Sequence, residues 1–209
     1  MGFSLGGAVT RKAILGGKCI DNNNDLGPPL TSIVSKYFSM SGVNWGVDFC
    51  VDRYRTQPIC NNVSGVYPYS SKFIKDINKE QHYEGKSTYI IASKNDEVVG
   101  YNEMYLPKAD VNVTFNCVGS PTNMNGFFPF HVAAMLQTLN SQFELIKTGR
   151  VSQQTLDADV QSENLNFGQQ CTGTVQYGSQ DENNSRSYNV FSCSFFVVAA
   201  FLILRFVLY

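Results

Sequence analysis

The sequence predicts an α+β protein with a mainly antiparallel sheet, one long amphipathic helix and a C-terminal transmembrane helix. Three observations lead to this prediction. Short β-branched and aromatic segments lie between residues 87 and 117, a helical stripe follows in residues 129–147, and the chain ends in an apolar run. Asn, Ser, Tyr, Phe and Gly are plentiful, which favours a β-rich body with ordered loops over a helical bundle.

Residues 1–27 are interpreted as a Gly/Asn-rich N-terminal arm. The stretch "MGFSLGGAVTRKAILGGKC" has no apolar core of useful length before Arg11 and Lys12, so it does not have the pattern of a signal peptide. Gly2 raises the idea of N-myristoylation, but that pattern needs Ser or Thr where this chain has Gly6. We therefore expect a flexible arm that orders against a neighbour.

Residues 28–178 are predicted to form the globular α+β domain. Apolar side chains at helical spacing in residues 30–38 indicate a first helix. Residues 87–106 are interpreted as a hairpin, because two β-branched and aromatic runs flank "SKNDE". Apolar and polar side chains then alternate through residues 111–117, which is the period of a half-buried strand.

The long helix is expected from Pro129 to about Lys147, with Pro129 in its first turn and Gly149 after its end. Its apolar stripe consists of Val132, Leu136, Leu139, Phe143 and Ile146. Such a stripe packs on the sheet or pairs with a partner helix, and we favour the sheet.

After a polar stalk at residues 179–189, residues 190–209 are predicted to form a membrane anchor. About 20 helical residues rise ~30 Å, the thickness of the hydrocarbon core of a bilayer. A buried core element and a cleavable lipid-anchor signal are the alternatives. The anchor side chains are Phe195, Phe196 and Leu202, with Arg205 reaching the far interface.

The cysteines predict at most one local disulfide and no metal site. Cys50 and Cys60 enclose the polar loop "VDRYRTQPI", and either a disulfide or two half-buried thiols fits this spacing. The chain has no CxxC pair, and His82 and His131 are far apart in sequence, so we expect neither zinc nor any other cofactor.

The residues that could act in catalysis form no recognised motif, which favours a protein that is not an enzyme. A nucleophile needs a base within reach, and the candidates considered are a cysteine paired with His82 or His131. The Gly pairs do not form a phosphate-binding loop, and the carboxylates are scattered. The net charge of −1 provides no basic field for a nucleic acid.

Aromatic side chains beside Gly or Pro indicate a protein interface or a sugar-binding surface, and ordinary core lining is the alternative. These candidates are Tyr67, Tyr69, Phe127, Phe128 and Phe130.

The order of the arm, a cysteine-bearing domain and the terminal "SFFVVAAFLILRFVLY" resembles the plan of membrane-associated minor capsid proteins of large icosahedral DNA viruses with an internal membrane. The resemblance implies a structural protein of the virion. Such a scaffold crosses the lipid bilayer once, through its C-terminus, and links it to other structural proteins.

Two other functions remain open. Sequons at Asn62, Asn112 and Asn183 favour a lectin-like binding domain on the cell surface or in the lumen, while the missing signal peptide opposes it. An enzyme on a membrane that uses a Cys–His pair is the third hypothesis.

Overall fold

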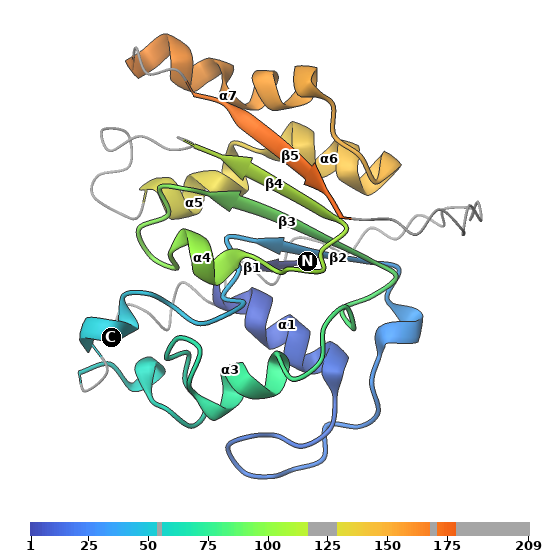
Figure 1. Cartoon of the computed structure of the whole chain (residues 1–209), viewed down its shortest axis with the longest axis vertical. Helices are drawn as coiled ribbons and strands as arrows, with labels where there is room; N and C mark the ends of the chain where they lie inside the picture. Colours follow the sequence, from blue (N-terminus) through green and yellow to red (C-terminus); the bar gives the residue numbers. More distant parts are fainter. Residues whose placement is uncertain (54–55, 117–128, 168–170, 179–209) are drawn as a thin grey trace.

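The computed structural model describes residues 1–53, 56–116, 129–167 and 171–178. Within these ranges, five strands form one sheet in the order β1-β2-β3-β4-β5 (Figure 1). The first four strands run parallel, and β5 is antiparallel to β4. The strands are β1 (Gly2–Phe3), β2 (Lys36–Met40), β3 (Ser87–Ser93), β4 (Val111–Phe115) and β5 (Gly173–Tyr177).

The prediction of a mainly antiparallel sheet is therefore wrong. Residues 87–93 are a strand, but they pair in parallel with β2 and β4 instead of folding back on residues 98–106. The second half of the expected hairpin contains helix α4 (Tyr101–Met104), which the chain enters at Gly100 with φ of 91°. The core of β3 reads "TYIIA", and all five of these residues are buried, which is typical of a parallel strand that is covered on both faces.

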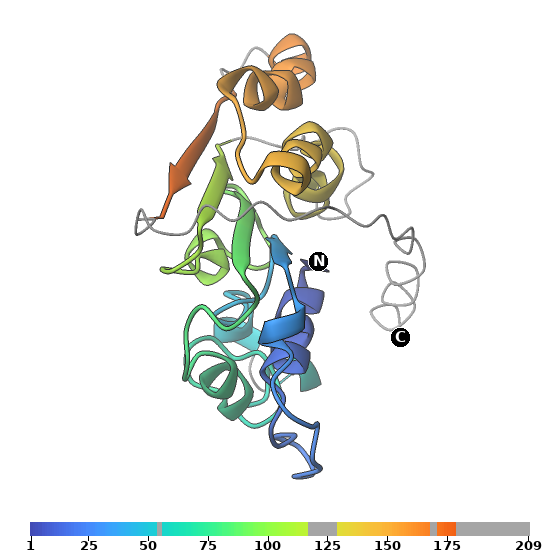
Figure 2. The same cartoon turned by 90° about the vertical axis from the view of Figure 1, so that its right-hand side faces the viewer.

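Alternate residues of β2 and β3 point into two separate cores, one on each face of the sheet. Tyr37 and Ile90 belong to the core beneath α1 (Leu5–Leu15), α3 (Lys72–Ile77) and α4. Phe38 and Ile91 belong to the other core, which is covered by α6 (Leu139–Thr148) and α7 (Gln153–Phe167). Figure 2 shows α4 and α6 on opposite sides of the strands. This is the layering of an α/β protein.

The expected long helix is two helices, α5 (Pro129–Leu136) and α6, and its stripe does not face the core along α6. In α6 the buried side is formed by Ser141, Gln142 and Leu145. Gly149 ends this helix in the left-handed conformation, at φ of 73°. Four members of the predicted stripe are exposed, namely Leu136, Leu139, Phe143 and Ile146.

The segment expected as an arm contributes to the fold. Residues 2–15 form β1 and α1, and Ala8 and Ile14 are buried in the core on that face. The remaining short elements are η1 (Thr31–Ile33), α2 (Cys50–Arg53) and η2 (Pro58–Cys60).

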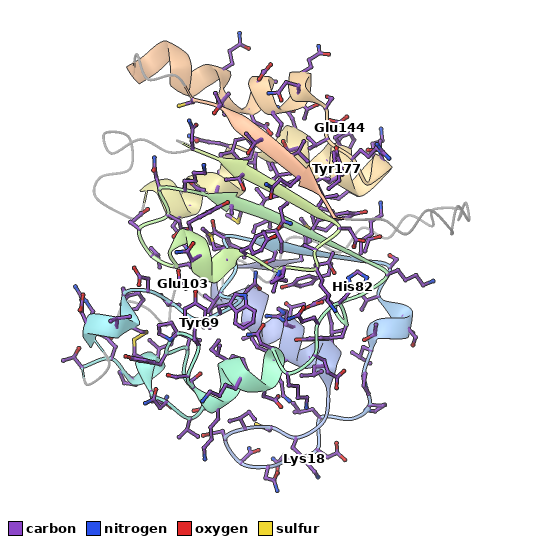
Figure 3. All side chains as sticks on the ribbon, viewed as in Figure 1. Lys18, Tyr69, His82, Glu103, Glu144 and Tyr177 are labelled. Carbon is purple, nitrogen blue, oxygen red and sulfur yellow. A yellow bond between two sulfur atoms is a disulfide. The ribbon has the colours of Figure 1, made fainter. Side chains whose placement is uncertain are left out.

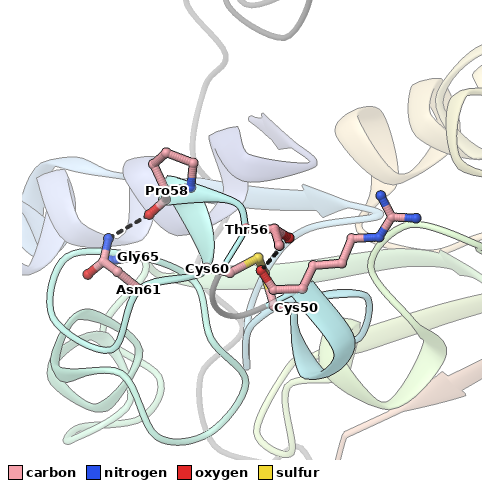
Figure 4. Close-up of a disulfide and its surroundings, with 7 residues drawn as sticks. Cys50, Thr56, Pro58, Cys60, Asn61 and Gly65 are labelled. Atoms are coloured by element: carbon pink, nitrogen blue, oxygen red, sulfur yellow. Dashed lines mark hydrogen bonds between the residues drawn. A yellow bond between two sulfur atoms is a disulfide. The ribbon is translucent and has the colours of Figure 1, made fainter.

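A disulfide joins Cys50 at the start of α2 to Cys60 at the end of η2 (Figure 4). Both cysteines are fully buried. Asn61 extends this local structure, since its side-chain amide donates to the carbonyl of Pro58 and its Oδ1 accepts three backbone N–H groups from Val63 to Gly65. The disulfide thus closes residues 50–60, and the hydrogen bonds of Asn61 order the turn that follows.

The predicted stalk and anchor, including Phe195, Phe196, Leu202 and Arg205, lie outside the described residues. Among the residues that the structure does describe, none of the helices combines the length and the apolar character needed to cross a bilayer.

Candidate active site

Ser4 occupies a sharp turn between β1 and α1. Its backbone has φ of 54° and ψ of −130°, a strained conformation for a residue with a side chain. The surrounding structure holds this conformation in place, because Ser4 N–H donates to Met40 O at 3.1 Å and Ser4 O accepts from Val43 N at 3.0 Å. A strained serine between a strand and a helix is the geometry of a nucleophile elbow, which presents the hydroxyl above the sheet.

Close packing of β1 on α1 explains the glycine two residues before Ser4. A Cβ atom on Gly2 would lie 2.6 Å from both Gly6 O and Gly7 Cα, so no other residue fits without a shift of the backbone. Gly2 to Gly6 reads "GFSLG", which is the G-x-S-x-G pattern of such elbows. Ser4 is not among the predicted nucleophiles, which were cysteines alone, although the G-x-S-x-G pattern is visible in the sequence.

Asp96 and His131 form a buried pair at the same edge of the sheet. Asp96 follows the end of β3 by three residues, and His131 is the third residue of α5. Nδ1 of His131 lies 2.8 Å from Oδ2 of Asp96, and their side chains are 6% and 0% exposed. The other carboxylate oxygen, Oδ1, accepts the backbone N–H groups of Val98 and Val99. Both oxygens of Asp96 are thus engaged, and its orientation is fixed.

Burial by itself would raise the pKa of the Asp96 carboxyl. The hydrogen bond and charge of His131, together with the Val99 N–H, outweigh this effect and lower the pKa of Asp96 below its ordinary value. Asp96 therefore stays a carboxylate, which can accept a hydrogen bond from Nδ1 of His131.

Phe3 brings the elbow and the Asp96–His131 pair together. Its ring centroid lies 4.8 Å from that of His131, so the residue next to Ser4 packs against the imidazole. Ser4 and Asp96 both follow the carboxyl ends of parallel strands, where functional groups of open α/β sheets meet. Their chain order is serine, aspartate, histidine, which is the order of the α/β-hydrolase triad.

The N-terminus of α1 supplies groups that stabilise negative charge. Leu5, directly after Ser4, is the first residue of this 11-residue helix. Its N–H has no carbonyl partner within the helix, and the positive end of the helix dipole lies at the same place. In nucleophile elbows the N–H of the residue after the serine is one donor of the oxyanion hole, and Leu5 holds that position.

Most of the cysteines proposed for a Cys–His pair are unavailable to act as nucleophiles. Cys50 and Cys60 are bonded to each other, and Cys171 is also in a disulfide. Cys19 is the free thiol in the described part of the chain. Of the two histidines, His82 is exposed and contacts the carbonyl of Lys108, whereas His131 lies in the site.

The predicted aromatic interface is only partly described. Tyr69 is exposed on the surface, where its hydroxyl donates to Glu103 at 3.1 Å (Figure 3). Burial and the Glu103 carboxylate raise the pKa of Tyr69 to about 12. Tyr67 is partly buried against the core beneath α1. The side chains of Phe127, Phe128 and Phe130 lie outside the described residues.

The mostly parallel sheet with helices on both faces, the Ser4 elbow and the buried Asp96–His131 pair fit the plan of an α/β-hydrolase. Comparison with known families agrees, because residues 1–144 match the family Lipase (class 2). The match covers more than half of the chain, which therefore belongs to the class 2 lipase family. No curated protein and no solved structure matches the chain.

Membership of this family corrects several predictions. The resemblance to viral minor capsid proteins is wrong, and so is the prediction of a non-enzymatic scaffold that links a bilayer to other structural proteins. The lectin-like alternative and the localisation as a C-terminally anchored virion protein are contradicted with it. The order of segments that suggested them does not determine function, which depends on the site instead.

Proposed function

We propose that this protein hydrolyses carboxylic esters of fatty acids by acyl transfer, with Ser4 as the nucleophile. The observation that carries the proposal is the strained Ser4 at the end of β1, beside a buried Asp96–His131 pair. The class 2 lipase match supports the choice of esters.

The residues then have distinct roles in two half-reactions. His131 accepts the Ser4 hydroxyl proton on Nε2 while Ser4 Oγ attacks the ester carbonyl carbon, and Asp96 keeps Nδ1 protonated. The N–H of Leu5 stabilises the negative oxygen of the tetrahedral intermediate. His131 returns the proton to the departing alcohol. Water then attacks the acyl-serine by the same route and releases the fatty acid.

The test is hydrolysis of p-nitrophenyl esters of short and long acyl chains by the full chain and its Ser4→Ala variant. We expect a loss of kcat on the order of 10⁴- to 10⁶-fold, because the residual rate comes only from binding and the oxyanion donors. Ser32→Ala is the matched control, since Ser32 is exposed in η1 and does not line the cavity beside Leu5.

A second measurement identifies the nucleophile directly. An organophosphate ester should add to the protein covalently, and mass spectrometry should place the adduct on Ser4. An active Ser4→Ala variant, or an adduct on another residue, would show that the assignment is wrong.

A further inference from the structure

Glu97 makes a contact with His131 that the triad does not require. Its Oε2 accepts a hydrogen bond from the backbone N–H of His131 at 3.2 Å. His131 is in the first turn of α5, so this N–H has no carbonyl partner within the helix. A side chain 34 residues away in sequence therefore fills a role that a local capping residue usually fills.

Two neighbouring carboxylates thus hold the same histidine at two points. Asp96 binds the ring at Nδ1, and Glu97 binds the backbone. We infer that Glu97 is a positioning residue, which fixes the start of α5 against the end of β3 and so sets where the His131 imidazole lies. The inference rests on the proposed function, because the position matters for catalysis only if His131 is the base.

The loop that carries Glu97 is rigid enough for this role. The N–H of Asp96 donates to Ser93 O, and Asp96 Oδ1 accepts the N–H groups of Val98 and Val99, on the far side of Glu97. The backbone of Glu97 is therefore held from both sides. The carboxylate also lies at the positive end of the α5 dipole, which favours its charge there.

The Glu97 side chain is exposed, so a role in positioning His131 can be distinguished from a role in stabilising the fold. Loss of a capping acceptor costs about 0.5–2 kcal/mol, so a protein that lacks this exposed contact should stay folded. Catalysis is more sensitive, because a displacement of about 1 Å in a catalytic group lowers the rate on the order of 10²-fold. A positioning role therefore predicts a large change in kcat with a small change in melting temperature.

The first experiment compares Glu97→Ala with Glu97→Gln in the full chain, using p-nitrophenyl ester hydrolysis. Alanine removes the acceptor, and we expect kcat to fall about 10- to 100-fold while KM stays within about twofold. Glutamine keeps an acceptor oxygen without the charge, and it should restore most of the rate. Glu80→Ala is the matched control, because Glu80 is an exposed glutamate elsewhere on the surface.

The second experiment measures hydrogen exchange of the His131 amide in the native protein, which needs no activity. Exchange should be about 10-fold faster in Glu97→Ala and unchanged in Glu80→Ala. Unchanged exchange in Glu97→Ala would show that the hydrogen bond from the His131 N–H to Glu97 does not protect this amide, which contradicts the proposal. Faster exchange with an unchanged kcat would overturn the positioning role and leave the proposed function standing. Wild-type protein without esterase activity would overturn the proposed function, and the positioning role with it, while the exchange data would still report the contact.

Discussion

Nδ1 of His131 lies 2.8 Å from Oδ2 of Asp96, and water has almost no access to either side chain. Asp96 accepts two backbone N–H groups at its other oxygen, so its carboxylate cannot rotate away from the ring. The pair therefore favours the tautomer with a proton on Nδ1, which is the one that the proposed mechanism requires.

The first prediction concerns Asp96→Asn. An amide in this position can donate to Nδ1, which favours the wrong tautomer and leaves no acceptor for the Nδ1 proton. We expect kcat to fall on the order of 10⁴-fold, as for the same change in serine protease triads, with little change in KM. The measurement is steady-state ester hydrolysis at pH 7.

Asp157→Asn is the matched control for that change. Asp157 lies exposed on α7, where it accepts a hydrogen bond from Gln153. It should retain full activity. An Asp96→Asn variant with more than about a tenth of the wild-type kcat would contradict the orienting role.

The second prediction concerns acid pH. His131 and the Val99 N–H lower the pKa of Asp96 in the folded state despite its burial, so ionised Asp96 stabilises the fold. This stabilisation is fully present above the ordinary pKa of 3.8 and is lost as the pH falls through the lower folded pKa. Urea unfolding at several pH values should show a free-energy difference between the wild type and Asp96→Asn that shrinks below that pH. If the free-energy difference stays constant as the pH falls below 3.8, ionised Asp96 does not stabilise the fold.

The sequence predicts individual strands better than their pairing. Residues 87–93 and 111–115 are recognisable from β-branched and alternating side chains, and both are strands. Whether two strands pair in parallel depends on the crossover between them, which leaves only weak local signals. The predicted apolar stripe does not mark the buried face of α6. That face contains the polar residues Ser141 and Gln142 as well as Leu145, so hydrophobicity alone does not identify it.

The candidate site was readable only in part. Ser4 stands in a complete G-x-S-x-G pattern, so the sequence contains the signal that marks it as a candidate nucleophile. His131 was a candidate, but with cysteine as its partner. Asp96 looked like a turn residue, because nothing in its neighbours shows that the chain brings it against a histidine 35 residues away.

The third prediction tests the packing of the elbow. Gly2→Ala places a Cβ atom 2.6 Å from Gly6 O and Gly7 Cα, both backbone atoms, so β1 and α1 must separate. We expect a loss of about 1–3 kcal/mol in the free energy of unfolding, together with reduced activity. The measurement is denaturant unfolding of both proteins.

Gly6→Ala is the matched control, because Gly6 belongs to the same G-x-S-x-G segment but lies in α1. A Cβ atom on Gly6 meets nothing within 4 Å, and the residue lies in a helix, where alanine is favoured over glycine. Its stability should be unchanged or slightly higher. Equal losses from both substitutions would show that close packing is not the reason for Gly2.

The fourth prediction concerns the network that holds α1, the helix that begins next to Ser4. Arg11 is 1% exposed and donates to Glu84 Oε1 at 2.9 Å, as well as to Ile77 O and Asn78 Oδ1. Glu84→Ala leaves a buried guanidinium without its counter-charge, which costs about 3–5 kcal/mol in comparable pairs. Because other acceptors remain, we expect the lower end of that range from denaturant unfolding.

Lys79→Ala is the comparison that separates burial from charge pairing. Lys79 also pairs with a carboxylate, that of Asp76, but its side chain is 52% exposed. Water screens this pair, so the loss should stay below about 1 kcal/mol. If Glu84→Ala costs no more than Lys79→Ala, the Arg11 network does not anchor α1. If it costs several times more, the buried pair supports the helix whose first residue follows the nucleophile, and activity should fall together with stability.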